Sequence, residues 1–144
     1  MNIVTNSIVN LDMLAGLKSC RILLVGGEYN HERRDFSGPL SEKIMALFHY
    51  KKCFLGCEGW TPNAGFSSNH LGVSSMNTLA ISCSDKKYIL MDSSKFGVSG
   101  LITFTNAQNI NSIITYKLPA GDFGEALNNS GMDVLLAPAD IPAP

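Results

Sequence analysis

The sequence predicts an α/β fold with an open, mostly parallel sheet and helices on both faces. Short apolar runs alternate along the chain with segments of helical periodicity, and most runs end in glycine or polar residues. The run at 88–91 lacks the polar alternation of a half-exposed strand, so it requires burial on both faces, as in a parallel sheet covered by helices. The 144 residues suit one domain, expected at 1–137, before an extended proline-rich tail at 138–144.

The first third of the chain predicts a strand-helix-strand unit followed by a loop and a second helix. Asn6 or Ser7 can accept the free amide hydrogens of a helix start, and apolar residues then recur at helical spacing. Gly26-Gly27 closes the next apolar run, so the two strands should be parallel. Pro39 suits the first turn of the second helix. The expected elements are strand 2–7, helix 8–18, strand 21–25, polar loop 28–37 and helix 39–48.

The rest of the chain repeats the order of strand and helix. Glycines punctuate the segment after the third strand, which predicts a loop there, and a less regular piece follows the run at 88–91. The expected elements are strand 53–57, loop 58–65, helix 71–84, strand 88–91, irregular segment 98–110, strand 112–115, helix 123–129 and strand 134–137.

Four polar loops should converge at one edge of the sheet, because ligands of parallel sheets collect outside the carboxyl ends of the strands. Glycines allow backbone amides to approach a ligand, and hydroxyls can bind sugar or phosphate oxygens, so the edge suits a small polar, anionic metabolite. The alternative is that these residues only cap turns while the charges are solvated. The residues expected to bind the ligand are Thr5, Asn6, Ser7, Gly26, Gly27, Glu28, Gly56, Glu58, Gly59, Asp92, Ser93, Ser94 and Lys95.

Composition argues against several classes of function. Eleven basic and twelve acidic residues give a net charge of -1, which offers no footprint for direct nucleic-acid binding. No apolar run is long enough for a bilayer, so a soluble, cytoplasmic protein is expected. The spacing of the four cysteines is not that of a zinc site, and nucleotide-binding glycine motifs are missing, so we expect buried reduced thiols and neither metal nor cofactor. Arg33-Arg34 is the best basic pair for a phosphate, although such pairs are more often solvated.

Seven short motifs carry a resemblance to a known family. They are Val4-Thr5-Asn6-Ser7, Leu24-Val25-Gly26-Gly27-Glu28-Tyr29, Phe36-Ser37-Gly38-Pro39-Leu40, Phe54-Leu55-Gly56-Cys57-Glu58-Gly59, Gly65-Phe66-Ser67, Asp92-Ser93-Ser94-Lys95-Phe96-Gly97 and Ile113-Ile114-Thr115. In this order, from Ile3 to about Ala137, the chain resembles the carboxyl-terminal effector-sensing domain of DeoR-family bacterial transcription regulators. The motif that begins at Asp92 is the most specific of the seven.

The resemblance implies a fold related to ribose-5-phosphate isomerase, glucosamine-6-phosphate deaminase and the coenzyme A transferases. It also implies a domain that senses a phosphorylated sugar without converting it, and so changes the assembly and DNA binding of its regulator. Family members carry a helix-turn-helix and a first sensor strand with a phosphate loop before the motif at Thr5. We therefore interpret the chain as a truncated regulator without DNA binding of its own.

Two alternatives stay open from the sequence. One is a sugar-phosphate isomerase or deaminase relative that uses Glu58 or Asp92 as a base. The other is a degenerate fragment that acts only by pairing with intact regulator subunits. A parallel sheet without its first strand-helix unit would expose a strand edge and an apolar face, so we expect a homo-oligomer.

Overall fold

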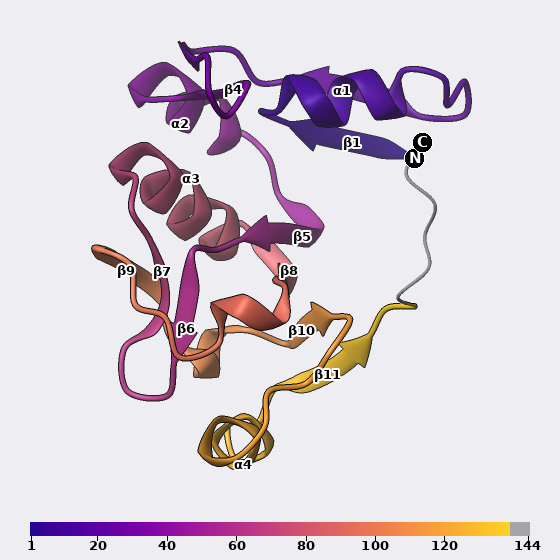
Figure 1. Ribbon diagram of the computed structural model, residues 1–144. Coiled ribbons are helices and arrows are strands. Elements are labelled where there is room, and N and C mark those ends of the chain that lie inside the picture. Colours follow the sequence, from indigo (N-terminus) through magenta and orange to yellow (C-terminus); the bar gives the residue numbers. More distant parts are fainter. Residues whose placement is uncertain (139–144) are drawn as a thin grey trace. The chain divides into compact units, whose positions relative to one another are not determined.

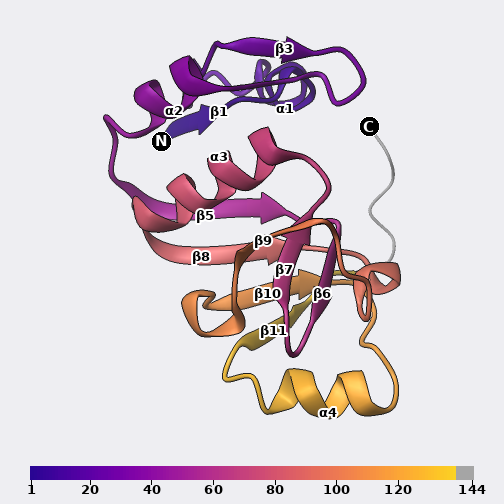
Figure 2. The ribbon, with the colours of Figure 1, turned by 90° about the vertical axis from the view of Figure 1, so that its left-hand side faces the viewer.

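A computed structural model describes residues 1–138 of the chain, so the tail expected at 138–144 lies outside the described residues except for Pro138. The chain forms two compact units, Met1–His49 and a second unit that begins at Tyr50. Figures 1 and 2 show the elements of both units. Each unit is described by itself below.

The first unit opens with the predicted parallel strand-helix-strand motif. Strand β1 (Asn2–Thr5) pairs in parallel with β2 (Arg21–Leu24), and α1 (Ile8–Leu14) connects them. Ser7 caps the helix, because its hydroxyl accepts the backbone N–H of Asn10 at 3.3 Å. The sequence prediction of this motif is confirmed, although the helix ends earlier than expected.

The prediction of a polar loop at 28–37 is wrong, because this segment forms an antiparallel hairpin of β3 (Glu28–Asn30) and β4 (Asp35–Ser37). The Asn30 side chain accepts the N–H of Arg33 at 2.9 Å, and Arg34 has a left-handed φ of 54°, which closes the turn. The polar composition of so short a hairpin hid its strands. Helix α2 (Pro39–Met45) follows, with proline in its first turn as predicted.

The second unit contains a four-stranded parallel sheet with the order β11-β10-β8-β5. Its strands are β5 (Tyr50–Gly56), β8 (Ser84–Leu90), β10 (Ser112–Thr115) and β11 (Asp133–Leu136). The predicted α/β class with a mostly parallel sheet is therefore confirmed. Strand β8 begins four residues earlier than the predicted start at Tyr88, because the lysines at its amino end masked the apolar pattern.

An antiparallel sheet in the same unit corrects two further expectations. Strands β6 (Gly59–Thr61) and β7 (Gly65–Ser68) form a hairpin where a loop was expected at 58–65, and β9 (Ile102–Thr105) pairs with β7 inside the segment expected to be irregular. Helices α3 (Leu71–Ser82) and α4 (Asp122–Asn128) lie close to their predicted positions. The short 3₁₀ helices η1 (Ser93–Lys95) and η2 (Ala107–Asn109) complete the unit.

The core of the second unit lies on one face of the parallel sheet. Ile89 and Ile113 are fully buried there against Trp60 and Phe66 of the hairpin and Leu127 of α4. The four strands follow one another in a single direction across the sheet, so right-handed crossovers place their helices on the same face. Figure 2 shows the hairpin strands in front of this face. The lone tryptophan is thus a core anchor.

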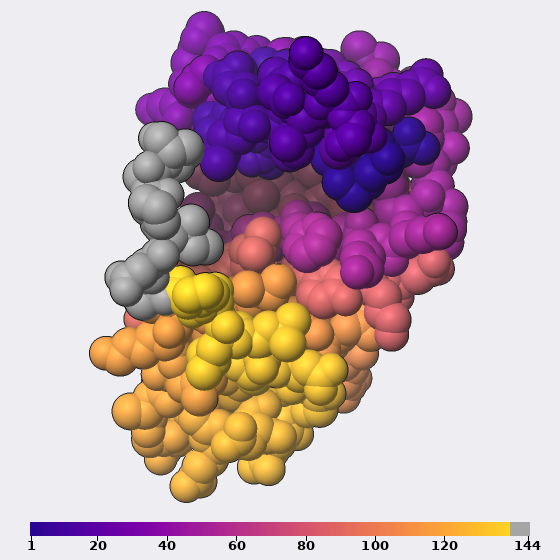
Figure 3. Space-filling model, turned by 90° about the vertical axis from the view of Figure 1, so that its right-hand side faces the viewer, coloured from indigo at the N-terminus to yellow at the C-terminus, as the bar shows by residue number. Residues whose placement is uncertain are grey.

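The opposite face of this sheet is apolar and exposed. The burial on both faces expected for the run at 88–91 is therefore wrong, because only one face of β8 is covered and Leu90 is 45% exposed. Phe54, Leu90 and Leu135 on β5, β8 and β11 are among the exposed large hydrophobic residues, and strand register places Tyr88 and Ile114 on the same side. In Figure 3 the strands that form this face run from magenta through orange to yellow.

Within residues 1–138, every helix is too short or too polar to span a membrane.

Candidate functional site

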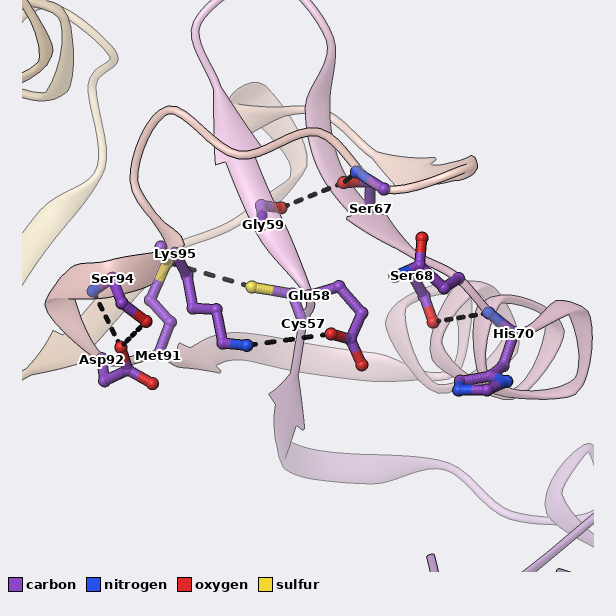
Figure 4. A network of polar contacts seen from close by, with 12 residues as sticks. Cys57, Glu58, Gly59, Ser67, Ser68, His70, Met91, Asp92, Ser94 and Lys95 are labelled. Carbon is purple, nitrogen blue, oxygen red and sulfur yellow. Dashed lines mark hydrogen bonds and ion pairs between the residues drawn. The ribbon is translucent and has the colours of Figure 1, made fainter.

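Two neighbouring strands of the second unit deliver charged side chains to one place. Glu58 follows the end of β5, and Lys95 lies in η1 after β8; the Lys95 Nζ is 3.7 Å from the Glu58 Oε2. Figure 4 shows the two side chains pointing toward one another. The loop after β8 is held in place because the Gly97 N–H donates to the Trp60 carbonyl at 2.9 Å. Strand ends and this backbone bond therefore position the pair.

Asp92 caps the turn that carries Lys95. Its carboxylate accepts hydrogen bonds from the backbone N–H of Ser94, at 2.8 Å, and from the Ser94 hydroxyl. These bonds, and to a lesser degree the charge of Lys95, lower the pKa of Asp92 below its usual 3.8. The carboxylate is thus ionised at neutral pH, where it can accept hydrogen bonds from ligand hydroxyls and is a weak proton acceptor.

A protonated thiol lies beside the charged pair. The Cys57 thiol donates to the Met91 sulfur at 4.0 Å, next to Glu58 in the chain (Figure 4). Burial raises the pKa of Cys57 to about 12, although the nearby Lys95 charge opposes the shift. The thiol therefore stays neutral and is a poor nucleophile at neutral pH.

Ser67 and Asn77 support the site, and the sequence analysis did not single them out for it. The buried Ser67 hydroxyl accepts the Gly100 N–H at 2.7 Å and donates to the Gly59 carbonyl at 3.3 Å. The Asn77 amide donates to the Gly56 carbonyl at 3.0 Å. Asn77 lies on the buried side of α3, and a polar residue at a core position of a helix is the signal that could have drawn attention to it.

The two glycines of the Gly56-x-x-Gly59 motif differ in their surroundings. A Cβ at Gly59 would lie 2.2 Å from the Val98 carbonyl oxygen, whereas a Cβ at Gly56 would meet nothing within 4 Å. Close packing of the chain on itself therefore explains Gly59. Gly56 leaves open space next to the end of β5.

The residues predicted in the first unit form a second group at the ends of β1 and β2. Thr5 accepts the N–H of Ser7 at 3.2 Å, Ser7 caps α1, and the Asn6 amide donates to the Phe36 carbonyl at 2.7 Å. These polar groups therefore already satisfy local backbone, as the capping interpretation requires.

The glycines of the first unit repeat the difference seen in the second. A Cβ at Gly27 would lie 2.0 Å from the Ser41 hydroxyl oxygen, and a Cβ at Gly26 would meet nothing within 4 Å. The Ser41 hydroxyl donates to the Gly26 carbonyl at 2.8 Å, which fixes this turn. Glu28 opens β3 with an exposed side chain.

The other candidates of the sequence analysis are the basic pair Arg33-Arg34, the cysteines and a metal site. Arg33 pairs with Asp35 at 3.0 Å, and Arg34 pairs with Asp12 at 3.0 Å, so carboxylates already neutralise this basic pair. All four cysteines are free; Cys53 is buried, and Cys20, Cys57 and Cys83 are partly buried. Residues 1–138 contain no group of three or more His, Cys, Asp or Glu side chains that could hold a metal ion.

Comparison with known proteins identifies the family to which this arrangement belongs. The model of the DeoR C terminal sensor domain matches residues 1–117, which is most of the chain. The chain belongs to the DeoR sensor-domain family. The resemblance deduced from the seven sequence motifs is therefore confirmed.

Relatives of this sensor domain are transcription regulators. The chain is 32% identical over 114 residues to the L-fucose operon activator of Haemophilus influenzae, covering 78% of the chain and 45% of the relative. It is 25% identical to the putative aga operon transcriptional repressor of Escherichia coli O157:H7, covering 92% and 49%. It is also 25% identical to the lactose phosphotransferase system repressor of Staphylococcus epidermidis, covering 80% and 46%. The chain thus spans about half the length of the curated relatives it matches.

Proposed function

We propose that this sensor domain binds a phosphorylated sugar and passes the signal to the assembly of a DeoR-type regulator. The observation that carries the proposal is the juxtaposition of Lys95 and Glu58 at the carboxyl ends of neighbouring parallel strands. Ligands of open α/β sheets bind at this edge. The names of two relatives refer to fucose and lactose, which supports a sugar as the effector class.

Each side chain of the pair suits one part of such a ligand. The Lys95 ammonium, about one third exposed, offers a positive charge to a phosphate group. Glu58 and the ionised Asp92 can accept hydrogen bonds from sugar hydroxyls, and Ser93 and Ser94 lie beside them in η1. A phosphate would replace Glu58 as the counterion of Lys95, so ligand binding would move the Glu58 side chain.

The group in the first unit is proposed to contact the same class of ligand. Gly26 leaves its backbone accessible, and Glu28 carries an exposed carboxylate. Gly27 packs against Ser41 between these two residues, the Asn6 amide donates to Phe36 of the hairpin that Glu28 opens, and Thr5 and Ser7 fix the nearby start of α1. Their substitution should therefore weaken binding through local backbone geometry.

The proposed domain is a sensor without catalysis of its own. The lowered pKa of Asp92 disfavours the base that a sugar isomerase requires, and the relatives are regulators. The near-neutral charge of the chain argues against direct DNA contact by this domain.

A thermal-shift screen against phosphorylated sugars tests the proposal. A ligand that binds only the folded state stabilises it by about 2.7 kcal/mol at a hundredfold excess over its dissociation constant. We expect a selective shift that Lys95→Ala abolishes and Lys51→Ala preserves, because Lys51 is an exposed lysine near the amino end of the same sheet. The proposed site would be refuted if both variants showed the same thermal shift. It would also be refuted if no sugar phosphate shifted the melting temperature of the wild type. Turnover of a sugar phosphate that Asp92→Asn abolishes would show an enzyme instead.

A further inference from the structure

We propose that the exposed face of the four-stranded sheet pairs with the same face of a second copy of this chain. This outer face consists of Phe54, Tyr88, Leu90, Ile114 and Leu135, with Gly56, Ser112, Lys52, Lys86 and Asp133 beside them. The inference assigns a surface to the proposed oligomerisation and does not depend on effector binding. A two-fold axis parallel to the strands relates the two copies.

The outer face has the character of an interface. Phe54, Leu90 and Leu135 are 54%, 45% and 46% exposed, although parallel sheets are normally covered on both faces. The rings of Phe54 and Tyr88 stack at 5.0 Å between centroids and 15° between planes, so they present a flat aromatic surface. Contiguous exposed apolar residues mark interaction surfaces, whereas isolated ones do not.

Strand register arranges the outer face in rows across the sheet. One row contains Phe54, Tyr88, Ser112 and Asp133, because these residues are Cα partners from β5 to β11. The next row toward the carboxyl ends contains Gly56, Leu90, Ile114 and Leu135. Each row thus combines large side chains on some strands with small ones on others.

A two-fold axis parallel to the strands lays a large residue on a smaller one at three of the four kinds of contact in these rows, including Phe54 on Asp133 of the second copy, and lays two large aliphatic residues on each other at the fourth. It places β5 over β11 of the second copy and β8 over β10, since rotation reverses the strand order and keeps the strand direction. Tyr88 then faces Ser112 of the second copy, and Leu135 faces Gly56. Leu90 faces Ile114. Two stacked sheets pack about 10 Å apart with interdigitating side chains, which this alternation of sizes permits.

The charges of the outer face complement each other under the same axis. Lys52 on β5 and Asp133 on β11 form no ion pair within residues 1–138. The axis lays Lys52 of one copy over β11 of the other copy, one row away from Asp133. An axis perpendicular to the strands would lay β5 on β5 and leave these charges about 14 Å apart, three strand spacings. Charge complementarity therefore favours a second copy as the occupant and the parallel axis as its arrangement.

Sedimentation equilibrium of the whole chain tests the proposal. We expect a dimer, and we expect Phe54→Asp to raise its dissociation constant by about thirtyfold or more, as for a large aromatic residue that anchors an interface. Leu101→Asp is the matched control, because Leu101 is 82% exposed and lies outside the outer face. Emission of Trp60, buried in the core, shows whether each variant is folded.

A charge swap tests the arrangement without removing an apolar side chain. Lys52→Asp and Asp133→Lys should each weaken the dimer, and the two together should restore it, because each interface then carries the reversed pair. The proposal would be overturned by a monomeric wild-type chain or by a dimer insensitive to Phe54→Asp. A monomer whose β8 and β10 amides resist hydrogen exchange would also overturn it, and would show that another part of the same chain covers the outer face. Effector binding by a Phe54→Asp monomer would separate this outcome from failure of the sensor site.

Discussion

The Lys95 Nζ lies 3.7 Å from the Glu58 Oε2, and the two residues follow neighbouring parallel strands. The side chains are 32% and 40% exposed, so water screens their attraction and the pair should add only about 0 to 1 kcal/mol to stability. We therefore expect Lys95→Ala to shift the urea midpoint little. A large loss of stability would show that Lys95 is structural, and its effect on ligand binding would then be indirect.

The glycines at positions 56 and 59 provide a matched pair of substitutions in one motif. Gly59→Ala should destabilise the fold strongly, because its Cβ would lie 2.2 Å from the Val98 carbonyl oxygen and backbone would have to move. Gly56→Ala meets open space, so its stability should stay within about 0.5 kcal/mol of the wild type. Urea unfolding measures both variants. Equal destabilisation would contradict the packing assigned to Gly59.

The sequence predicted the parallel elements well because their signals are local. Apolar runs gave β10 at Ser112–Thr115, and the cap at Ser7 gave the start of α1. Both hairpins were missed, since β3 and β6 have only three residues each and depend on pairing with strands that the local pattern does not reveal.

The candidate site could be predicted only in part. The position of Glu58 and Lys95 followed from the rule that ligands bind at strand ends. The support from Ser67 to Gly59 and Gly100 could not be predicted, because it joins segments far apart in the sequence. The roles of Gly27 and Gly59 in close packing were likewise not predictable, because their neighbours Ser41 and Val98 lie 14 and 39 residues further along the chain.

Trp60 is the only tryptophan and is 1% exposed in the core of the second unit. Trp60→Ala should cost about 3 to 5 kcal/mol, as for other large aromatic residues in cores. Trp60→Phe should cost less, because the buried Nε1 has no hydrogen-bond partner within the described residues. Calorimetry compares the two variants, with Tyr116→Ala at an exposed position as the control. A Phe variant as unstable as the Ala variant would show that the indole nitrogen has a partner.

The capping bonds of Asp92 should make a small, pH-dependent contribution to stability. Because its pKa is lower in the folded state, the contribution is present above the usual value of 3.8 and is lost as the pH falls through the folded pKa. Asp92→Asn should therefore differ from the wild type at about pH 6, and the difference should shrink as the pH falls below 3.8 and through the folded pKa. Urea unfolding across this range measures the difference. A constant difference would mean that the charge of Asp92 does not act through these bonds.

Cys57 should resist alkylation in the folded protein. A pKa raised from 9.0 to about 12 leaves about a thousandfold less thiolate near neutral pH, and the thiolate is the reactive form. Iodoacetamide followed by mass spectrometry should label Cys57 slowly in the folded chain and rapidly in urea. Rapid labelling of the folded chain would contradict the burial assigned to this thiol.

The same shift predicts a loss of stability in alkali. The unfolded chain releases the Cys57 proton near pH 9.0 and the folded chain only near 12, so stability is complete below 9.0 and falls between these values. Other groups titrate in the same range, and the informative quantity is therefore the difference between wild type and Cys57→Ala. This difference should decrease as the pH rises above 9.0. A difference in stability that stays constant with pH would show that the Cys57 thiol is more accessible to solvent than its burial and its contact with Met91 imply.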